Sequence, residues 1–217
     1  MKIAILGGTF NPLHIGHCLL ADTVKTDLGY DKIIFVPTGK PPHKKITGSV
    51  SAEQRFLMLD EFCKTTDSFI AEDYEIKKEG LSFTYETILY LLRKYENVLT
   101  EKPGLIMGQE VAAEFYKWHK NEEIAELSTL ILARRHPDNN SVDVKGFENE
   151  NFRNYTGAFV SDDFEKDFKW PHIMLENPIL PISSTEIRSR IAHHKSFEYL
   201  VPREIFLYIK RNGLYQK

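Results

Sequence analysis

The first 36 residues strongly constrain how this chain can fold. Two short apolar runs, Lys2–Leu6 and Ile33–Val36, are typical of buried strands, and the segment from about Gly16 to Leu28 between them predicts a helix. Gly29 then follows as the residue that would end this helix. A strand, a helix and a second strand in so short a stretch form a βαβ unit, so the two strands are expected to run parallel in one sheet.

The rest of the chain continues the alternation and predicts an α/β fold with a parallel sheet. We expect one domain over residues 1–217, with a sheet core over 1–182 and a small C-terminal helical element over 183–217. A polar stretch from Arg134 to Trp170 is expected to be a surface excursion. The pattern predicts further strands at Ser68–Ile76, Gly104–Met107, Leu127–Ala133 and His172–Leu175, and further helices at Ser51–Lys64, Thr84–Tyr95, Glu110–Trp118, Ser184–His193 and Pro202–Arg211.

Composition excludes several classes of function. The formal net charge of −3 over 217 residues argues against nonspecific binding to nucleic acid, which needs a basic face. No apolar run approaches the roughly 20 residues of a membrane span, and the opening run is too short for a signal peptide. Cys18 and Cys63 have no zinc-site spacing and are expected to be free thiols. We therefore expect a cytoplasmic protein with no nucleic-acid or membrane partner.

The loop after the first strand has the composition of a phosphate-binding turn. It reads Gly-Gly-Thr-Phe-Asn-Pro-Leu-His-Ile-Gly-His over residues 7–17. Glycines at a strand-to-helix turn let backbone amides face an anion, and ligands of open parallel sheets bind at this end of the strands. His14 and His17 can donate hydrogen bonds to phosphate oxygens. A metal site would need a third ligand, and none lies nearby in the sequence.

A second candidate anion site lies near the C-terminus, at Ile182-Ser-Ser-Thr-Glu-Ile-Arg188. Ser183 and Glu186 fit the spacing of a capping box, so a helix is predicted to begin here with free backbone amides. A cap alone does not explain three consecutive hydroxyl residues with Arg188 one turn later. Hydroxyls, amides and a guanidinium together indicate a phosphate site.

These two segments resemble the signature motifs of the nucleotidylyltransferase superfamily, in which an aspartate usually stands at the position of Asn11. Further segments are similar to bacterial nicotinate mononucleotide adenylyltransferases. Lys40-Pro-Pro-His-Lys44 resembles their lysine-bearing loop, and Ser82-Phe-Thr-Tyr-Glu-Thr87 resembles the segment that lines their nicotinate site. Gly108-Gln-Glu110, Trp118 and Ala133-Arg-Arg135 match other family segments, with Glu110 in place of an aspartate and Arg135 in place of a proline.

The resemblance implies a Rossmann-like doubly wound sheet and adenylyl transfer from ATP to nicotinate mononucleotide, with Mg²⁺ arriving on ATP and no metal site in the protein. Alternatives are nicotinamide mononucleotide or another phosphorylated acceptor such as phosphopantetheine, or a nucleotide-sensing domain without catalysis. The sequence leaves the oligomeric state open, with a homo-oligomer as one alternative. The implied catalytic residues are His14, His17, Lys44 and Arg188. Implied ATP contacts are Gly7, Gly8, Thr9, Phe10, Gly16, Gly108, Glu110, Ile182, Ser183, Ser184 and Thr185, and implied acceptor contacts are Thr84, Tyr85, Trp118 and Arg134.

Overall fold

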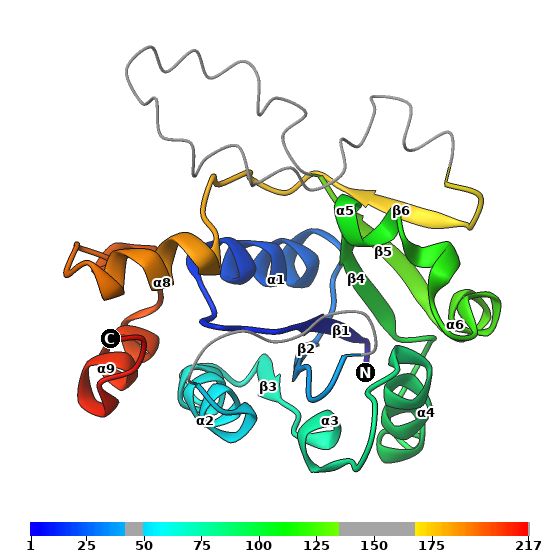
Figure 1. Cartoon of the computed structure of the whole chain (residues 1–217). Helices are drawn as coiled ribbons and strands as arrows, with labels where there is room; N and C mark the ends of the chain where they lie inside the picture. The colour runs from blue at the N-terminus through cyan, green and yellow to red at the C-terminus, as the bar shows by residue number, and fades with distance from the viewer. Residues whose placement is uncertain (42–49, 135–167, 217) are drawn as a thin grey trace.

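The computed structural model describes residues 1–41, 50–134 and 168–216. Six strands form one sheet in the order β3-β2-β1-β4-β5-β6, and every neighbouring pair is parallel (Figure 1). The order reverses between β1 and β4, which are neighbours in the sheet but far apart in the chain. The strands are β1 (Ile3–Gly8), β2 (Lys32–Pro37), β3 (Phe69–Ala71), β4 (Gly104–Gly108), β5 (Thr129–Ala133) and β6 (His172–Leu175). This is the strand order of doubly wound dinucleotide-binding sheets, so the predicted Rossmann-like fold is confirmed.

Helices cover both faces of the sheet, as parallel strands require. The longer ones are α1 (Ile15–Asp27), α2 (Ala52–Cys63), α4 (Thr84–Lys94), α6 (Asn121–Leu127), α8 (Ser184–Ala192) and α9 (Arg203–Asn212). Shorter turns are α3 (Tyr74–Lys77), α5 (Gln109–Ala112), η1 (Phe115–Lys117) and η3 (Glu198–Leu200).

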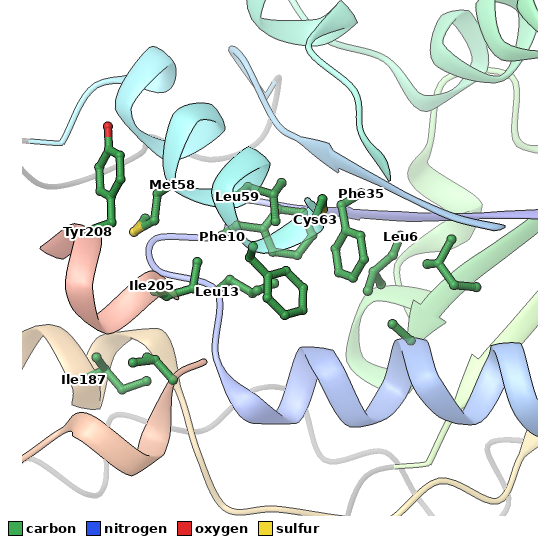
Figure 2. Packing of buried hydrophobic residues seen from close by; sticks show 14 of the residues in the cluster. Leu6, Phe10, Leu13, Phe35, Met58, Leu59, Cys63, Ile187, Ile205 and Tyr208 are labelled. Carbon is green, nitrogen blue, oxygen red and sulfur yellow. The ribbon is translucent and has the colours of Figure 1, made fainter. Parts of the chain in front are cut away.

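Side chains alternate along each strand and build two separate cores. Ala4 and Leu6 of β1 face the core that also contains residues of α1, α2, α8 and α9. Figure 2 shows part of this core, in which Phe10 and Phe35 lie near Leu59 and Cys63 of α2, and Ile205 of α9 lies near Leu13. The labelled residues are Leu6, Phe10, Leu13, Phe35, Met58, Leu59, Cys63, Ile187, Ile205 and Tyr208. The loop after β1 therefore packs directly against the C-terminal helices.

The opposite face carries the second core. Ile3 and Ile5 of β1 point into it, together with Ile88 and Leu91 of α4 and Ile124 of α6. An aromatic group completes it: Phe115 lies 4.9 Å from the ring centre of Trp170 and 5.4 Å from that of Trp118. This second core anchors the segments expected to bind the acceptor.

Most predicted elements are confirmed, but three differ. The expected strand Ser68–Ile76 ends at Ala71, and the chain then forms the single helical turn α3, whose amides at Ile76 and Lys77 bond the carbonyl of Asp73. The expected helix Glu110–Trp118 is broken into α5 and η1. Leu127, the first residue of the expected strand Leu127–Ala133, is the last residue of α6, a helix that was not predicted; the strand begins at Thr129. Short apolar runs are ambiguous between helix and strand, and tertiary packing decided each case.

Candidate functional site

The loop between β1 and α1 lies at the carboxyl edge of the sheet, next to the point where strand order reverses. Its glycines have different roles. A Cβ on Gly7 would meet nothing within 4 Å, so this position is open. A Cβ on Gly8 would lie 3.0 Å from Cζ of Phe10, whose backbone has a φ of 45°. Gly8 therefore leaves room for the Phe10 ring, which is buried in the first core.

His14 and His17 lie together at the start of α1. His14 is the residue before the helix, as predicted, and His17 is in its first turn. Their ring centres are 3.8 Å apart, and the edge-on ring of Phe10 is 5.2 Å from that of His17. A Cβ on Gly16 would lie 3.1 Å from Nδ1 of His14, so the glycine between the histidines allows this close arrangement.

The hydrogen bonding of His17 defines its protonation state. The backbone amide of His14 donates to Nδ1 of His17 at 3.3 Å, so the neutral ring carries its proton on Nε2. Burial, and secondarily the neighbouring His14, lowers the pKa of His17 well below 6.5. His17 is therefore a neutral imidazole at pH 7, with Nε2–H as its hydrogen-bond donor.

The structure brings the second motif into contact with the first. The hydroxyl of Ser184 donates to the carbonyl of Pro12 at 2.8 Å, and Nη1 of Arg188 donates to the carbonyl of Asn11 at 2.8 Å. These pairs are 172 and 177 positions apart in the chain. Arg188 also donates from Nη2 to the hydroxyl of Thr185 at 3.2 Å. The two motifs thus form one continuous surface at the edge of the sheet.

Ser183 caps the start of α8, as one half of the predicted capping box requires. The hydroxyl of Ser183 accepts from the amide of Glu186 at 3.1 Å, which makes Ser183 the N-cap. The carboxylate of Glu186 lies 3.6 Å from Arg190, one turn further along the helix. Ile182 packs against the first core. The exposed Thr185 and the half-buried Arg188 remain at the rim of the site.

On the acceptor side, Thr84 and Tyr85 are the first residues of α4, as expected. His119 lies 4.9 Å from Phe83 between ring centres, and Nζ of Lys120 lies 4.2 Å from the ring centre of Tyr85. These two contacts place the segment Trp118–Lys120 beside the start of α4, while Trp118 itself packs on Phe115. This juxtaposition joins two segments predicted separately.

The acceptor segment is also tied to the end of β2. The amide of Ser82 donates to the carbonyl of Lys40 at 2.9 Å, and the amide of Lys40 donates to the hydroxyl of Ser82 at 3.2 Å. Lys40 begins the segment that resembles the family's lysine loop. Lys44 itself, like Arg135, lies outside the described residues.

The remaining predicted residues have mixed placements. Gly108 ends β4 and Glu110 is in the first turn of α5, at the same sheet edge as Gly8, because β1 and β4 are parallel neighbours. Arg134 is exposed after β5, where its Nη1 lies 3.3 Å from Glu176 and its amide donates to Asn177. These contacts connect Arg134 to the residues after β6, and not to Thr84 or Trp118.

Two residues at the site were not predicted as contributors. Arg55 of α2 is buried and donates to the carbonyls of Thr9 and Thr38, and Tyr215 donates to the side chain of Asn11. Arg55 lies four residues before Leu59 and seven before Phe62, on the apolar face of its helix, and an arginine at such a position was a usable signal. The residues around Tyr215 in the sequence give no signal that its hydroxyl contacts a loop near the N-terminus.

No metal centre or membrane span is found in the part of the chain that the structure describes. Over residues 1–41, 50–134 and 168–216, no group of three or more His, Cys, Asp or Glu side chains could hold a metal ion. No helix in these ranges is long and apolar enough to cross a bilayer.

Comparison with known proteins identifies the family. The profile of the family described as cytidylyltransferase-like matches residues 5–190, which include both motifs. The chain belongs to the cytidylyltransferase-like family. Within this family, it is 36% identical over its full length to a probable nicotinate-nucleotide adenylyltransferase of Treponema pallidum, and the match covers all of that relative. It is also 36% identical to proteins of the same name from Borreliella afzelii and Caldicellulosiruptor saccharolyticus, covering 98% and 100% of them.

Solved structures support the family's fold for this chain. The nicotinic acid mononucleotide adenylyltransferase of Plasmodium falciparum, complexed with NaAD, superposes with a TM-score of 0.69 at 16% identity, over 99% of this chain and 97% of that one. A putative nicotinate-nucleotide adenylyltransferase from Vibrio parahaemolyticus superposes with a TM-score of 0.64 at 19% identity, over 100% and 97% of the two chains. The predicted resemblance to the superfamily is confirmed.

Proposed function

We propose that this protein transfers the adenylyl group of ATP to nicotinate mononucleotide, giving nicotinate adenine dinucleotide and pyrophosphate in NAD biosynthesis. The observation that carries the proposal is the direct contact between the two anion-binding motifs, through Ser184 to Pro12 and Arg188 to Asn11. Full-length identity of 36% to probable nicotinate-nucleotide adenylyltransferases supports the choice of reaction.

The reaction needs positioning and charge neutralisation, with no covalent bond to the protein. A phosphate oxygen of the mononucleotide attacks the α-phosphorus of ATP, the bond to the β-phosphate oxygen breaks, and pyrophosphate leaves with its electron pair. In this proposal the Nε2–H of His17 and the ring of His14 donate to the transferring phosphate. Amides of Gly8 and Thr9 face the same group.

The leaving pyrophosphate is assigned to the second motif. Arg188 has Nη2 near Thr185 at the rim of the site, where both can reach the β- and γ-phosphates. Lys44 is proposed to contribute a further positive charge. Gly7, Phe10, Gly16, Gly108, Glu110, Ile182 and Ser183 are proposed to shape the ATP site. Mg²⁺ is proposed to enter with ATP, bound chiefly by phosphate oxygens and water, and to neutralise phosphate charge.

The acceptor site is proposed at the start of α4. Free amides at Thr84 and Tyr85 favour a carboxylate, and the cationic side chain of Lys120 beside Tyr85 adds to this preference. Trp118 offers an aromatic face to the pyridine ring. Arg134 is proposed to contact the mononucleotide from the end of β5. These features favour nicotinate over nicotinamide mononucleotide.

The domain organisation, cellular location and partners are also part of this proposal. We expect one domain over residues 1–217, working in the cytoplasm with ATP and a pyridine mononucleotide as partners, where Cys18 and Cys63 stay reduced as the free thiols that the structure has. This proposal allows a homo-oligomer as well as a monomer.

The test is turnover with purified protein, ATP and Mg²⁺, following both pyrophosphate release and the dinucleotide formed. Nicotinate mononucleotide should give the highest kcat/KM, and nicotinamide mononucleotide and phosphopantetheine should be poorer acceptors. Tight ATP binding with no turnover on any pyridine mononucleotide would contradict the proposal and favour a nucleotide-sensing role.

A further inference from the structure

Arg55 lies directly behind the candidate phosphate site. It projects from α2, only 1% of its surface is exposed, and its guanidinium bridges two loops. Nη1 donates to the carbonyl of Thr9 at 2.6 Å, and Nη2 donates to the carbonyl of Thr38 at 2.7 Å. Thr9 follows β1 in the first motif, and Thr38 follows β2 before the segment containing Lys40. One side chain therefore holds together the exits of two adjacent strands.

The charge of Arg55 has no close counter-charge in the described structure. Over residues 1–41, 50–134 and 168–216, no Asp or Glu oxygen lies within salt-bridge distance of the guanidinium, and Nε has no hydrogen-bond partner there. Burial lowers the pKa of Arg55, while Tyr215, Glu53 and Glu75 act in the opposite direction from further away. An arginine nevertheless stays protonated at neutral pH, because its ordinary pKa lies far above 7.

A buried unpaired charge is an expensive way to join two loops. Taking an ion out of water costs several kcal/mol, and apolar residues often replace buried charges without loss of stability. Two neutral carbonyls offset only part of this cost. A requirement for positive charge at this place explains the arginine better than packing does, since the loop on the other side of Thr9 is the candidate polyphosphate site.

We propose that Arg55 is a positioning residue that also supplies a buried positive charge to the triphosphate of ATP, acting through the backbone of the turn at Thr9. The inference rests on the proposed function, because it assumes that a nucleotide binds against this turn. Since the guanidinium is excluded from water, its field toward the site is screened less than that of a surface lysine. Its effect on binding should therefore grow with the number of phosphates on the ligand.

The experiment compares affinities for adenosine, ADP and ATP by calorimetry in wild type, Arg55→Met and Arg55→Lys. For Arg55→Met we expect ATP affinity to fall about tenfold, ADP affinity to fall less and adenosine affinity to change less than about twofold. Arg55→Lys keeps the positive charge but lacks the two planar N–H donors of the guanidinium. The affinity of this variant should therefore still rise with the number of phosphates on the ligand, nearly as in wild type. An equal loss for all three ligands, or an equal loss in both variants, would show a purely structural role and overturn the proposal.

Two controls separate charge from packing. Arg211→Met removes an exposed positive charge of α9 that pairs with Glu61 at 2.5 Å, and should leave all three affinities unchanged. Tyr215→Phe removes a neutral hydrogen bond to the same turn, and any effect on binding should be the same for each ligand.

The proposal can still be tested if Arg55→Met does not fold. Arg55→Gln, which can still donate to one carbonyl without charge, then replaces it and should lose ATP affinity relative to Arg55→Lys. Failure of wild type to bind ATP would refute the proposed function. Normal ATP binding in wild type, together with an affinity loss in the neutral variant that is the same for adenosine, ADP and ATP, would refute only the role of Arg55.

Discussion

The hydroxyl of Tyr215 donates a 2.8 Å hydrogen bond to Oδ1 of Asn11, joining positions 204 residues apart. Both residues are buried, and the carbonyl of the same Asn11 accepts from Arg188. Burial raises the pKa of Tyr215, with Arg188 and Arg55 acting against this rise, so the hydroxyl stays protonated and can donate. The residues after α9 therefore support the turn that carries the first motif.

Replacing this hydroxyl tests the connection. Tyr215→Phe should lower the free energy of unfolding by about 1 to 2 kcal/mol, because a buried hydrogen bond is lost while the ring remains. It should also lower kcat, since the turn at Asn11 is held less firmly. Chemical denaturation and steady-state kinetics measure the two effects. Tyr199→Phe, at a tyrosine that is 86% exposed, should change neither value. Unchanged stability in Tyr215→Phe would contradict the prediction.

His17→Ala should lower kcat by roughly 100-fold or more and leave the KM for the mononucleotide nearly unchanged. The reason is that Nε2–H of His17 is assigned to the transferring phosphate and not to the pyridine. Steady-state kinetics with both substrates varied provides the measurement. A variant whose main defect was a raised KM for the mononucleotide would show that the role assigned to His17 is wrong.

The lowered pKa of His17 also predicts a dependence of stability on pH. The folded state binds this proton less readily than the unfolded chain, whose histidine has a pKa near 6.5. The contribution is fully present above pH 6.5 and is lost as pH falls below it, by up to about 1.4 kcal/mol per pH unit. Unfolding free energies between pH 5 and 7.5 should therefore fall less steeply in His17→Asn than in wild type. His193→Asn, at an exposed histidine, is the control and should follow the wild-type curve.

Gly16→Ala separates helix stability from site geometry. The new methyl group would lie 3.1 Å from Nδ1 of His14 and would displace that ring. Alanine nevertheless favours the helical backbone by about 0.5 to 1 kcal/mol over glycine. We expect the melting temperature to be kept while kcat falls about tenfold. Asp22→Ala, on the exposed side of the same helix, should leave kcat unchanged. Full activity in Gly16→Ala would show that the position of the His14 ring is unimportant.

Trp118→Ala should have the opposite kinetic signature to His17→Ala. Loss of the indole removes a face proposed for the pyridine, so the KM for nicotinate mononucleotide should rise about tenfold with a smaller change in kcat. The KM for ATP serves as the internal control and should remain close to that of wild type. A parallel rise in both KM values would point to disruption of the Phe115 aromatic core instead.

Much of the fold could be predicted because its signals are local. The buried strands β1, β2 and β4 are short apolar runs, as is the partly buried edge strand β6. Ser51 and Gly29 mark helix ends where the structure has them. The signals failed where an element was short. Tyr74–Lys77 and Phe115–Lys117 are single turns whose form depends on packing and not on periodicity.

The sequence by itself determined the parallel α/β sheet and the two anion-binding motifs, because hydrophobic spacing, glycine turns and helix caps act between near neighbours. Only the tertiary structure decided that Ser184 and Arg188 bond the backbone of the first motif, and that Arg55 and Tyr215 support it from behind. These contacts join positions that spacing cannot relate, since helices from both ends of the chain meet only after packing on one face of the sheet. The location of a buried charge behind Thr9 is therefore a property of the folded protein alone.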